Sequence, residues 1–119
     1  MLNHIVLMGR LTRDPELRRT QSGVPVVSFS LAVDHDYGDE VDFVSVIAWQ
    51  KTAEFIQKHF HKGSPIIIKG RLQSRKWEDR DGKKHTSWEV VAENAYFSGD
   101  KKSDSPVFVE SESNEELPF

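Results

Sequence analysis

The sequence predicts a small, mainly β domain in which five strands form a barrel and one helix lies between the third and fourth strands. Three observations predict this class. Apolar and polar residues alternate over residues 26–34 and again over 41–50, as in half-buried strands. Residues 51–63 change to a helical period, and a turn-forming DRDGKK segment separates two later apolar stretches. A chain of 119 residues is expected to form one domain with one core.

The first three strands are expected within residues 2–12, 26–34 and 41–50. The first is apolar and rich in β-formers, and the RDPELRRTQSG segment ends it. In the second, the residues expected to face the core are Val27, Phe29, Leu31 and Val33. In the third, Val44, Val46 and Ala48 lie on one side, and Phe43, Ser45, Ile47 and Trp49 lie on the other.

The helix is expected over residues 51–63, where Ala53, Ile56 and Phe60 recur at helical spacing and Gly63 ends the helix. Residues 65–78 return to a strand with a bend or bulge at Gly70. Residues 85–97 fit either a helix or a strand. The preceding hairpin turn and two β-branched valines favour a strand.

Strands and helix in the order β-β-β-α-β-β are typical of the OB-fold, a five-stranded Greek-key barrel that binds oligonucleotides or oligosaccharides. The domain is expected to span residues 1–98. From residue 99 the chain is polar, and residues 99–119 are predicted to form a flexible tail.

Charge divides the chain in the same way. All 16 Lys and Arg lie within residues 1–102, whereas five of the 19 Asp and Glu lie within residues 103–119. A mildly basic body therefore precedes an acidic tail. The chain has no cysteine, and its N-terminal segment lacks a basic leader and a long apolar run. We expect a cytoplasmic protein, associated with the nucleoid, that does not enter a membrane.

Catalytic and metal-binding patterns are missing from the sequence. The five histidines have no ligand spacing, and the DHDYGD loop lacks the ligand positions of a calcium loop. No nucleophile elbow or phosphate-binding loop is found. We expect no enzyme activity, no metal and no cofactor. A small OB-fold nuclease and an OB-fold RNA-binding or primosomal accessory protein remain as alternatives.

The fourth predicted strand carries the positive signal. With period 2, one side holds a cationic series that ends in an aromatic: Lys69, Arg71, Gln73, Arg75 and Trp77. Ile66, Ile68 and Leu72 lie on the other side. Cations neutralise phosphates, and a flat aromatic stacks on any base. Phe43 and Trp49 extend this series as a stacking platform. Trp88 lacks basic neighbours in sequence and is assigned to the core.

Four segments in order resemble the bacterial single-stranded DNA-binding protein family. They are LNHIVLMGRLTRDPELR at the start, WQKTAEF with HKGSPIIIKGRLQSRKW in the middle, and LPF at the end. The resemblance implies sequence-independent binding of single-stranded DNA in replication, recombination and repair. It also implies a homotetramer, with the LNHIVLM edge as the pairing strand, and recruitment of partner proteins through the tail.

Carried over residue by residue, the resemblance places base-stacking aromatics at Phe43, Trp49, Trp77 and Tyr37. It places cations along the DNA path at Lys51, Lys62, Arg75 and Lys76. Facing and charge add Arg10 and Arg71. The partner-binding tip is expected at Glu115, Glu116, Leu117, Pro118 and Phe119.

The chain also departs from the family. Residues 34–42 carry five acids where relatives often have basic residues, which is expected to weaken phosphate attraction near Tyr37. The PVFV segment of the tail has no physical explanation.

Overall fold

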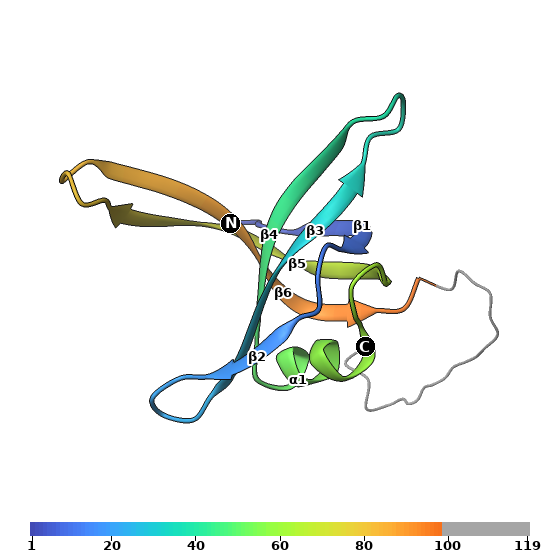
Figure 1. Ribbon diagram of the computed structural model, residues 1–119, viewed down its shortest axis with the longest axis horizontal. Helices are drawn as coiled ribbons and strands as arrows, with labels where there is room; N and C mark the ends of the chain where they lie inside the picture. The colour runs from blue at the N-terminus through green and yellow to red at the C-terminus, as the bar shows by residue number, and fades with distance from the viewer. Residues whose placement is uncertain (99–119) are drawn as a thin grey trace.

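The structure is a computed structural model and describes residues 1–98. The predicted tail, residues 99–119, lies outside the described residues, as do the five proposed partner-binding positions at its tip. The described part contains six strands and one helix (Figure 1): β1 (Ile5–Leu11), β2 (Glu16–Arg19), β3 (Pro25–Asp34), β4 (Val41–Trp49), α1 (Gln50–His59), β5 (Pro65–Glu78) and β6 (Lys84–Tyr96).

This order confirms the predicted class, a mainly β barrel whose helix lies between the third and fourth long strands. It adds one short strand, β2, within the RDPELRRTQSG segment that was expected only to end the first strand. The four residues of β2 pair only with the start of β3. Their ELRR sequence shows no apolar alternation because the strand lies at the edge of the sheet.

The sheet closes on itself. Its strands follow the order β1-β5-β6-β4-β3-β2, and β1 also pairs with β3 through Arg10 opposite Ala32 and Leu11 opposite Leu31. This second pairing joins β1 to β3, so β1, β5, β6, β4 and β3 close into a barrel and β2 remains at the edge. β4 and β6 run parallel, and the other pairs are antiparallel.

The core fills the barrel and the space beneath the helix. Most of the predicted inward-facing residues of β3 and β4 are buried, and Val33 and Val44 are partly buried against this core. Ala53, Ile56 and Phe60 from the helical segment are buried with them. Burial of these side chains at about 25 cal/mol per Å² of apolar surface is the main stabilising contribution. Within residues 1–98 no charged or polar residue is buried, and no helix is long and apolar enough to cross a membrane.

The helix is shorter than predicted. It ends at His59, and Phe60 is already extended, with φ −128° and ψ 146°. The change of direction turns the Phe60 ring into a cluster with Phe55 and Phe97, whose ring centroids lie 5.9 Å and 5.1 Å away. Gly63, the predicted stop, instead occupies the turn before β5, with φ +85°.

The bulge expected at Gly70 of β5 is found in the neighbouring strand, β6, opposite Gly70. Lys69 is opposite Asn94 and Gly70 is opposite Ala92, so Glu93 is the extra residue and belongs to β6. A Cβ at Gly70 would overlap the carbonyl of Val91, so this close approach of two strands requires glycine. Because the extra residue is not in β5, the alternation of β5 continues unbroken past Gly70.

Two hairpins extend beyond the barrel (Figure 1). β1 pairs with β5 only as far as Gly70, and β4 pairs with β6 only over residues 90–92, so residues 73–89 form a two-stranded arm. We call it the basic arm. Residues 33–42 of the β3–β4 hairpin form a second arm beyond the last contact of β3 with β1. We call it the acidic arm.

Candidate nucleic-acid interface

One continuous surface crosses β4, β6 and β5 on the outside of the sheet. Ile47 is opposite Val91 on β6, and Val91 is opposite Arg71 on β5, so side chains of the same parity share this surface. We call it the outer face. It consists of Phe43, Ser45, Ile47 and Trp49 of β4, His85, Ser87, Glu89 and Val91 of β6, and Arg71, Gln73, Arg75 and Trp77 of β5.

The predicted aromatics of β4 and β5 are exposed on this face. The exposed fractions are 69% for Phe43, 43% for Trp49 and 46% for Trp77. Large apolar rings on the surface of a barrel that has a complete core need another explanation than folding. Arg71 and Arg75 lie on the same face as the rings, which is the combination of stacking and cationic groups that the sequence predicted.

Trp77 is held in place on the basic arm. Its Nε1 donates a hydrogen bond of 2.8 Å to Ser87 Oγ, and its ring stacks on His85 with centroids 4.5 Å apart and planes 23° from parallel. His85 Nε2 in turn lies 2.8 Å from Asp79 Oδ2. One side of the indole is therefore covered by the imidazole, and a base can stack on the other side.

Asp79 organises the end of this arm. Its Oδ1 accepts hydrogen bonds of 2.9 Å from the backbone N–H groups of Asp81 and Lys83, which closes the turn. The hydrogen bond with His85, followed by that from Lys83, lowers the pKa of Asp79 below its ordinary value of 3.8. An ionised Asp79 thus connects the turn geometry to the orientation of Trp77.

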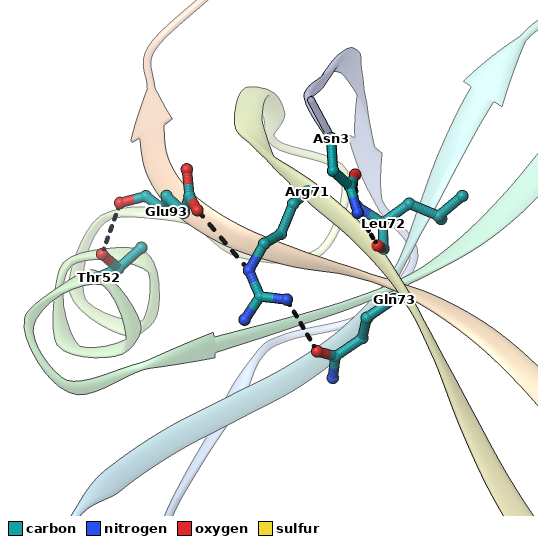
Figure 2. A network of polar contacts seen from close by, with 6 residues as sticks. All are labelled: Asn3, Thr52, Arg71, Leu72, Gln73 and Glu93. Atoms are coloured by element: carbon teal, nitrogen blue, oxygen red, sulfur yellow. Dashed lines mark hydrogen bonds and ion pairs between the residues drawn. The ribbon is translucent and has the colours of Figure 1, made fainter. Parts of the chain in front are cut away.

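Arg71 belongs to a polar network at the base of the basic arm (Figure 2). Its Nε lies 3.8 Å from Glu93 Oε2, and its Nη1 donates a hydrogen bond of 3.1 Å to Gln73 Oε1. Gln73 continues the network through a 2.9 Å hydrogen bond from its Nε2 to Glu89 Oε2. The charge of Arg71 is therefore partly neutralised by Glu93, whereas Arg75 forms no ion pair within residues 1–98.

Trp49 lies where β4 meets the helix. The next residue, Gln50, has φ +58°, an uncommon backbone conformation for a residue other than glycine. This turn starts the helix immediately after Trp49 and leaves the indole on the outer face. Thr52 Oγ1 donates a hydrogen bond of 3.1 Å to the carbonyl of Glu93, which ties the first helical turn to the bulge of β6 (Figure 2).

The other predicted cations lie away from the centre of the outer face. Lys76 is opposite Thr86 on the far side of the basic arm. Lys51 is exposed in the first turn of α1, and Lys62 follows the helix, where its backbone N–H donates to Asp14 Oδ1 at 2.7 Å. Arg10 shares the parity of Phe43 but forms a bidentate ion pair with Asp34, with both N–O distances 3.3 Å.

Tyr37 is exposed in the turn of the acidic arm. The acids around it are only partly neutralised. His35 lies between Glu40 and Asp42, 3.5 Å and 3.1 Å away, and Asp34 pairs with Arg10. Tyr37 therefore lies in a negative environment, on a different hairpin from Trp77.

One sequence prediction about burial is wrong. Trp88, assigned to the core, is 61% exposed. Leu72 lies on the same side of β5 as Ile66 and Ile68, as predicted, but is 38% exposed. By strand alternation, both residues lie on the side that faces the core farther along β5 and β6. They lie at the point where the hairpin leaves the barrel, so this parity no longer leads to a core.

Sequence reasoning also missed the groups that support the outer face. His85, Ser87, Glu89 and Glu93 all lie on β6 beside the predicted residues of β5. The signal was available in part, because counting outward from the DRDGKK turn pairs Trp77 with His85. Glu93 could not be paired correctly, because the count ignores the bulge.

Comparisons with known proteins agree with this geometry. Residues 2–98 match the model of the single-strand binding protein family. Single-stranded DNA-binding protein 1 of Staphylococcus aureus is 46% identical over 109 residues, which covers 87% of this chain and 70% of that protein. Single-stranded DNA-binding protein 2 of Listeria monocytogenes is 44% identical, over 82% of this chain and 64% of the relative. The chain belongs to the single-strand binding protein family.

Proposed function

We propose that this protein binds single-stranded DNA, with little preference for sequence, along its outer face. The observation that carries the proposal is the exposure of Phe43, Trp49 and Trp77 on one surface that also holds Arg71 and Arg75. The family match and the printed names of the relatives support the same ligand.

The mechanism follows from the groups present. Each ring stacks on one base, and stacking requires a base whose faces are free, which duplex DNA does not offer. The guanidinium groups bind phosphates and release counterions. Arg75 provides this charge directly. Arg71 must first exchange its carboxylate partner, Glu93, for a phosphate.

The test is a titration of tryptophan fluorescence with poly(dT). We expect saturable quenching that added salt relieves, and much weaker binding of a duplex of equal length. Comparable affinity for the duplex would contradict the proposal. Two further measurements use poly(U) and a labelled oligonucleotide with Mg²⁺. Preference for RNA or magnesium-dependent cleavage would favour the RNA-binding or nuclease alternatives, whereas we propose binding without catalysis.

The protein is further proposed to form a tetramer through β1. Val6 and Met8 are exposed on this strand, and β3 covers its second edge only at Arg10 and Leu11. An unpaired strand edge with exposed apolar side chains is a template for pairing with a second copy. Light scattering at micromolar concentration should give the mass of four chains, and a monomer would contradict this proposal.

The tail is proposed to recruit replication and repair proteins to DNA-bound copies in the cytoplasm. The supporting chemistry is in its last five residues, where Glu115 and Glu116 precede Leu117, Pro118 and Phe119. An apolar pocket ringed by Lys or Arg would accept the Phe ring and the carboxylates.

A deletion of residues 114–119 tests this role. The truncated protein should keep its affinity for poly(dT) and lose the partners that the full chain captures from a bacterial lysate. Phe119→Ala is the matched control, because it removes the ring and leaves every carboxylate. Capture of the same partners by the truncated protein would show that they bind elsewhere.

A further inference from the structure

The basic arm has a second face that the proposed function leaves unused. Side chains of the opposite parity point away from the outer face, and we call this surface the far face. From the barrel to the tip it holds Ser74, Lys76 and Glu78 of β5, opposite Trp88, Thr86 and Lys84 of β6. At the barrel end this face begins beside Leu72, which is 38% exposed and lies opposite the buried Val90.

Trp88 is the most exposed tryptophan of the protein. Its 61% exposure exceeds the 43% of Trp49 and the 46% of Trp77. Trp77 has a stacking partner and a hydrogen bond, but the Trp88 ring has neither a ring contact nor a hydrogen bond to any residue of the described part, 1–98. Its large apolar surface is therefore available to a ligand.

The neighbours of Trp88 indicate which ligand. Directly opposite is Ser74, and the diagonal neighbours across the strands are Leu72 and Lys76. Lys84 and Thr86 precede Trp88 on the same strand. A partner protein that docks by apolar burial needs a contiguous apolar patch, whereas this ring is surrounded mainly by hydroxyls and cations. A flat ring beside ammonium groups matches a base beside its phosphate.

The near and far faces of the arm are also connected. Trp88 is opposite Ser74, three residues before Trp77 on β5, so the two indoles are offset by about 10 Å along the arm and face opposite sides. The turn between the strands carries Arg80 and Lys83, both exposed. Cations therefore continue around the tip from one face to the other.

We propose that Trp88 is an additional base-stacking residue, with Lys76 as its phosphate contact, and that single-stranded DNA engages both faces of the basic arm. This inference rests on the proposed function. It assigns Lys76 a place in the binding surface that its position off the outer face had left open.

A variant with Trp88 as its only tryptophan tests the proposal directly. The chain has three tryptophans, so Trp49→Phe with Trp77→Phe leaves Trp88 as the sole reporter and keeps an aromatic ring at both other positions. Fluorescence anisotropy of a labelled dT oligonucleotide of about 35 nucleotides gives the concentration at which this variant is saturated. At that concentration we expect the emission of Trp88 to be strongly quenched. Saturated binding without quenching overturns the proposal.

Trp88→Ala and Trp88→Leu provide the second measurement, by anisotropy alone. Loss of one stacked base should lower affinity for the same oligonucleotide about 5- to 150-fold, and leucine should not restore it because it lacks a flat ring. Thr86→Ala, on the same face, is the matched control and should bind like the wild type. Should the alanine variant fail to fold, the leucine variant decides the outcome.

Other outcomes separate the two proposals. If the wild type itself binds no oligonucleotide, the proposed function fails. If the wild type binds and both Trp88 variants bind equally well, only the inference about Trp88 fails. If the variants instead reduce the molar mass in light scattering, Trp88 contacts another copy of the chain and the inference is wrong.

Discussion

The two arms have the same architecture and opposite electrostatics. Each is a hairpin that continues two barrel strands outward, and each carries an aromatic expected to stack on a base. The acidic arm has acids at Asp34, Asp36, Asp39, Glu40 and Asp42 and no Lys or Arg. The basic arm has five Lys or Arg and four Asp or Glu within residues 73–89. A nucleic-acid contact therefore needs both an exposed ring that stacks on a base and a positive charge that meets the phosphate.

Phosphates accompany every base that stacks, so the charge around a ring decides how much of the stacking energy is retained. On the basic arm, Trp77 is held by Ser87 and His85, and Arg75 lies on the same face. On the acidic arm, Tyr37 lies beside carboxylates. We therefore expect the proposed DNA path to depend on the basic arm and to be opposed by the acidic one.

The largest expected effect is that of Trp77→Ala. This change should weaken binding of poly(dT) by about 1–3 kcal/mol, the usual contribution of one stacked base. Tyr37→Ala should cost less than about 1 kcal/mol, because repulsion by the neighbouring acids already offsets its stacking. Anisotropy titrations at one salt concentration measure both changes, with thermal melts to confirm folding. Equal losses on the two arms would contradict the comparison.

A smaller effect is expected from Arg75→Ala. The plot of log Kobs against log salt should become shallower by about 0.7 per binding site, because one phosphate contact on a single strand is lost. Arg75→Lys keeps the charge and should keep the slope. If both variants change the slope alike, the guanidinium geometry rather than the charge is responsible, and the electrostatic account of the basic arm is incorrect.

Removing charge from the acidic arm should strengthen binding. Neither Asp36 nor Asp39 forms an ion pair within residues 1–98, so Asp36→Asn with Asp39→Asn removes repulsion without breaking a contact. We expect affinity for poly(dT) to rise by about 0.2–1 kcal/mol at low salt. The gain should disappear near 1 M salt, where the Debye length falls to about 3 Å. A gain that persists at high salt would point to a cause other than charge.

The smallest effect concerns the turn of the basic arm, measured without DNA. The pKa of Asp79 should lie below 3.8, because His85 and two backbone N–H groups stabilise its ionised form. This contribution to stability is complete above about pH 5, and it is lost progressively as the pH falls through the ordinary pKa of Asp79 and then through its lowered pKa in the folded state. Carboxyl chemical shifts from NMR follow the titration. His85→Ala should move the pKa of Asp79 upward, and no movement would show that His85 does not stabilise the carboxylate.

Most of the barrel was predictable because one side of each strand there faces a core. Val27, Phe29 and Leu31 of β3 and Val46 of β4 are buried as alternation requires. The same rule failed for Trp88 because a two-stranded arm has no interior. Parity tells which residues share a side of the arm, and only the barrel makes one of those sides apolar.

The candidate site was predictable for a related reason. Arg71, Arg75 and Trp77 share parity on one strand, so their common face follows from the sequence of β5 alone. The groups that hold them come from β6, and their positions depend on the turn and on the extra residue at Glu93. Gly70 marks an irregularity in β5, but the sequence does not tell that the extra residue belongs to β6. The pairing of Arg71 with Glu93 therefore had to come from the structure.

The closure of the barrel also sets an order of events during synthesis. Ile5 of β1 is opposite Gly70 of β5, 65 residues later in the chain. At about 5–20 residues per second, a ribosome needs roughly 3–13 s to make that segment. Hairpins form within about 1–10 μs, so β3 and β4 can pair as soon as both have emerged. β1 therefore has no main partner strand until β5 has been synthesised, and until then its apolar residues are exposed to other chains.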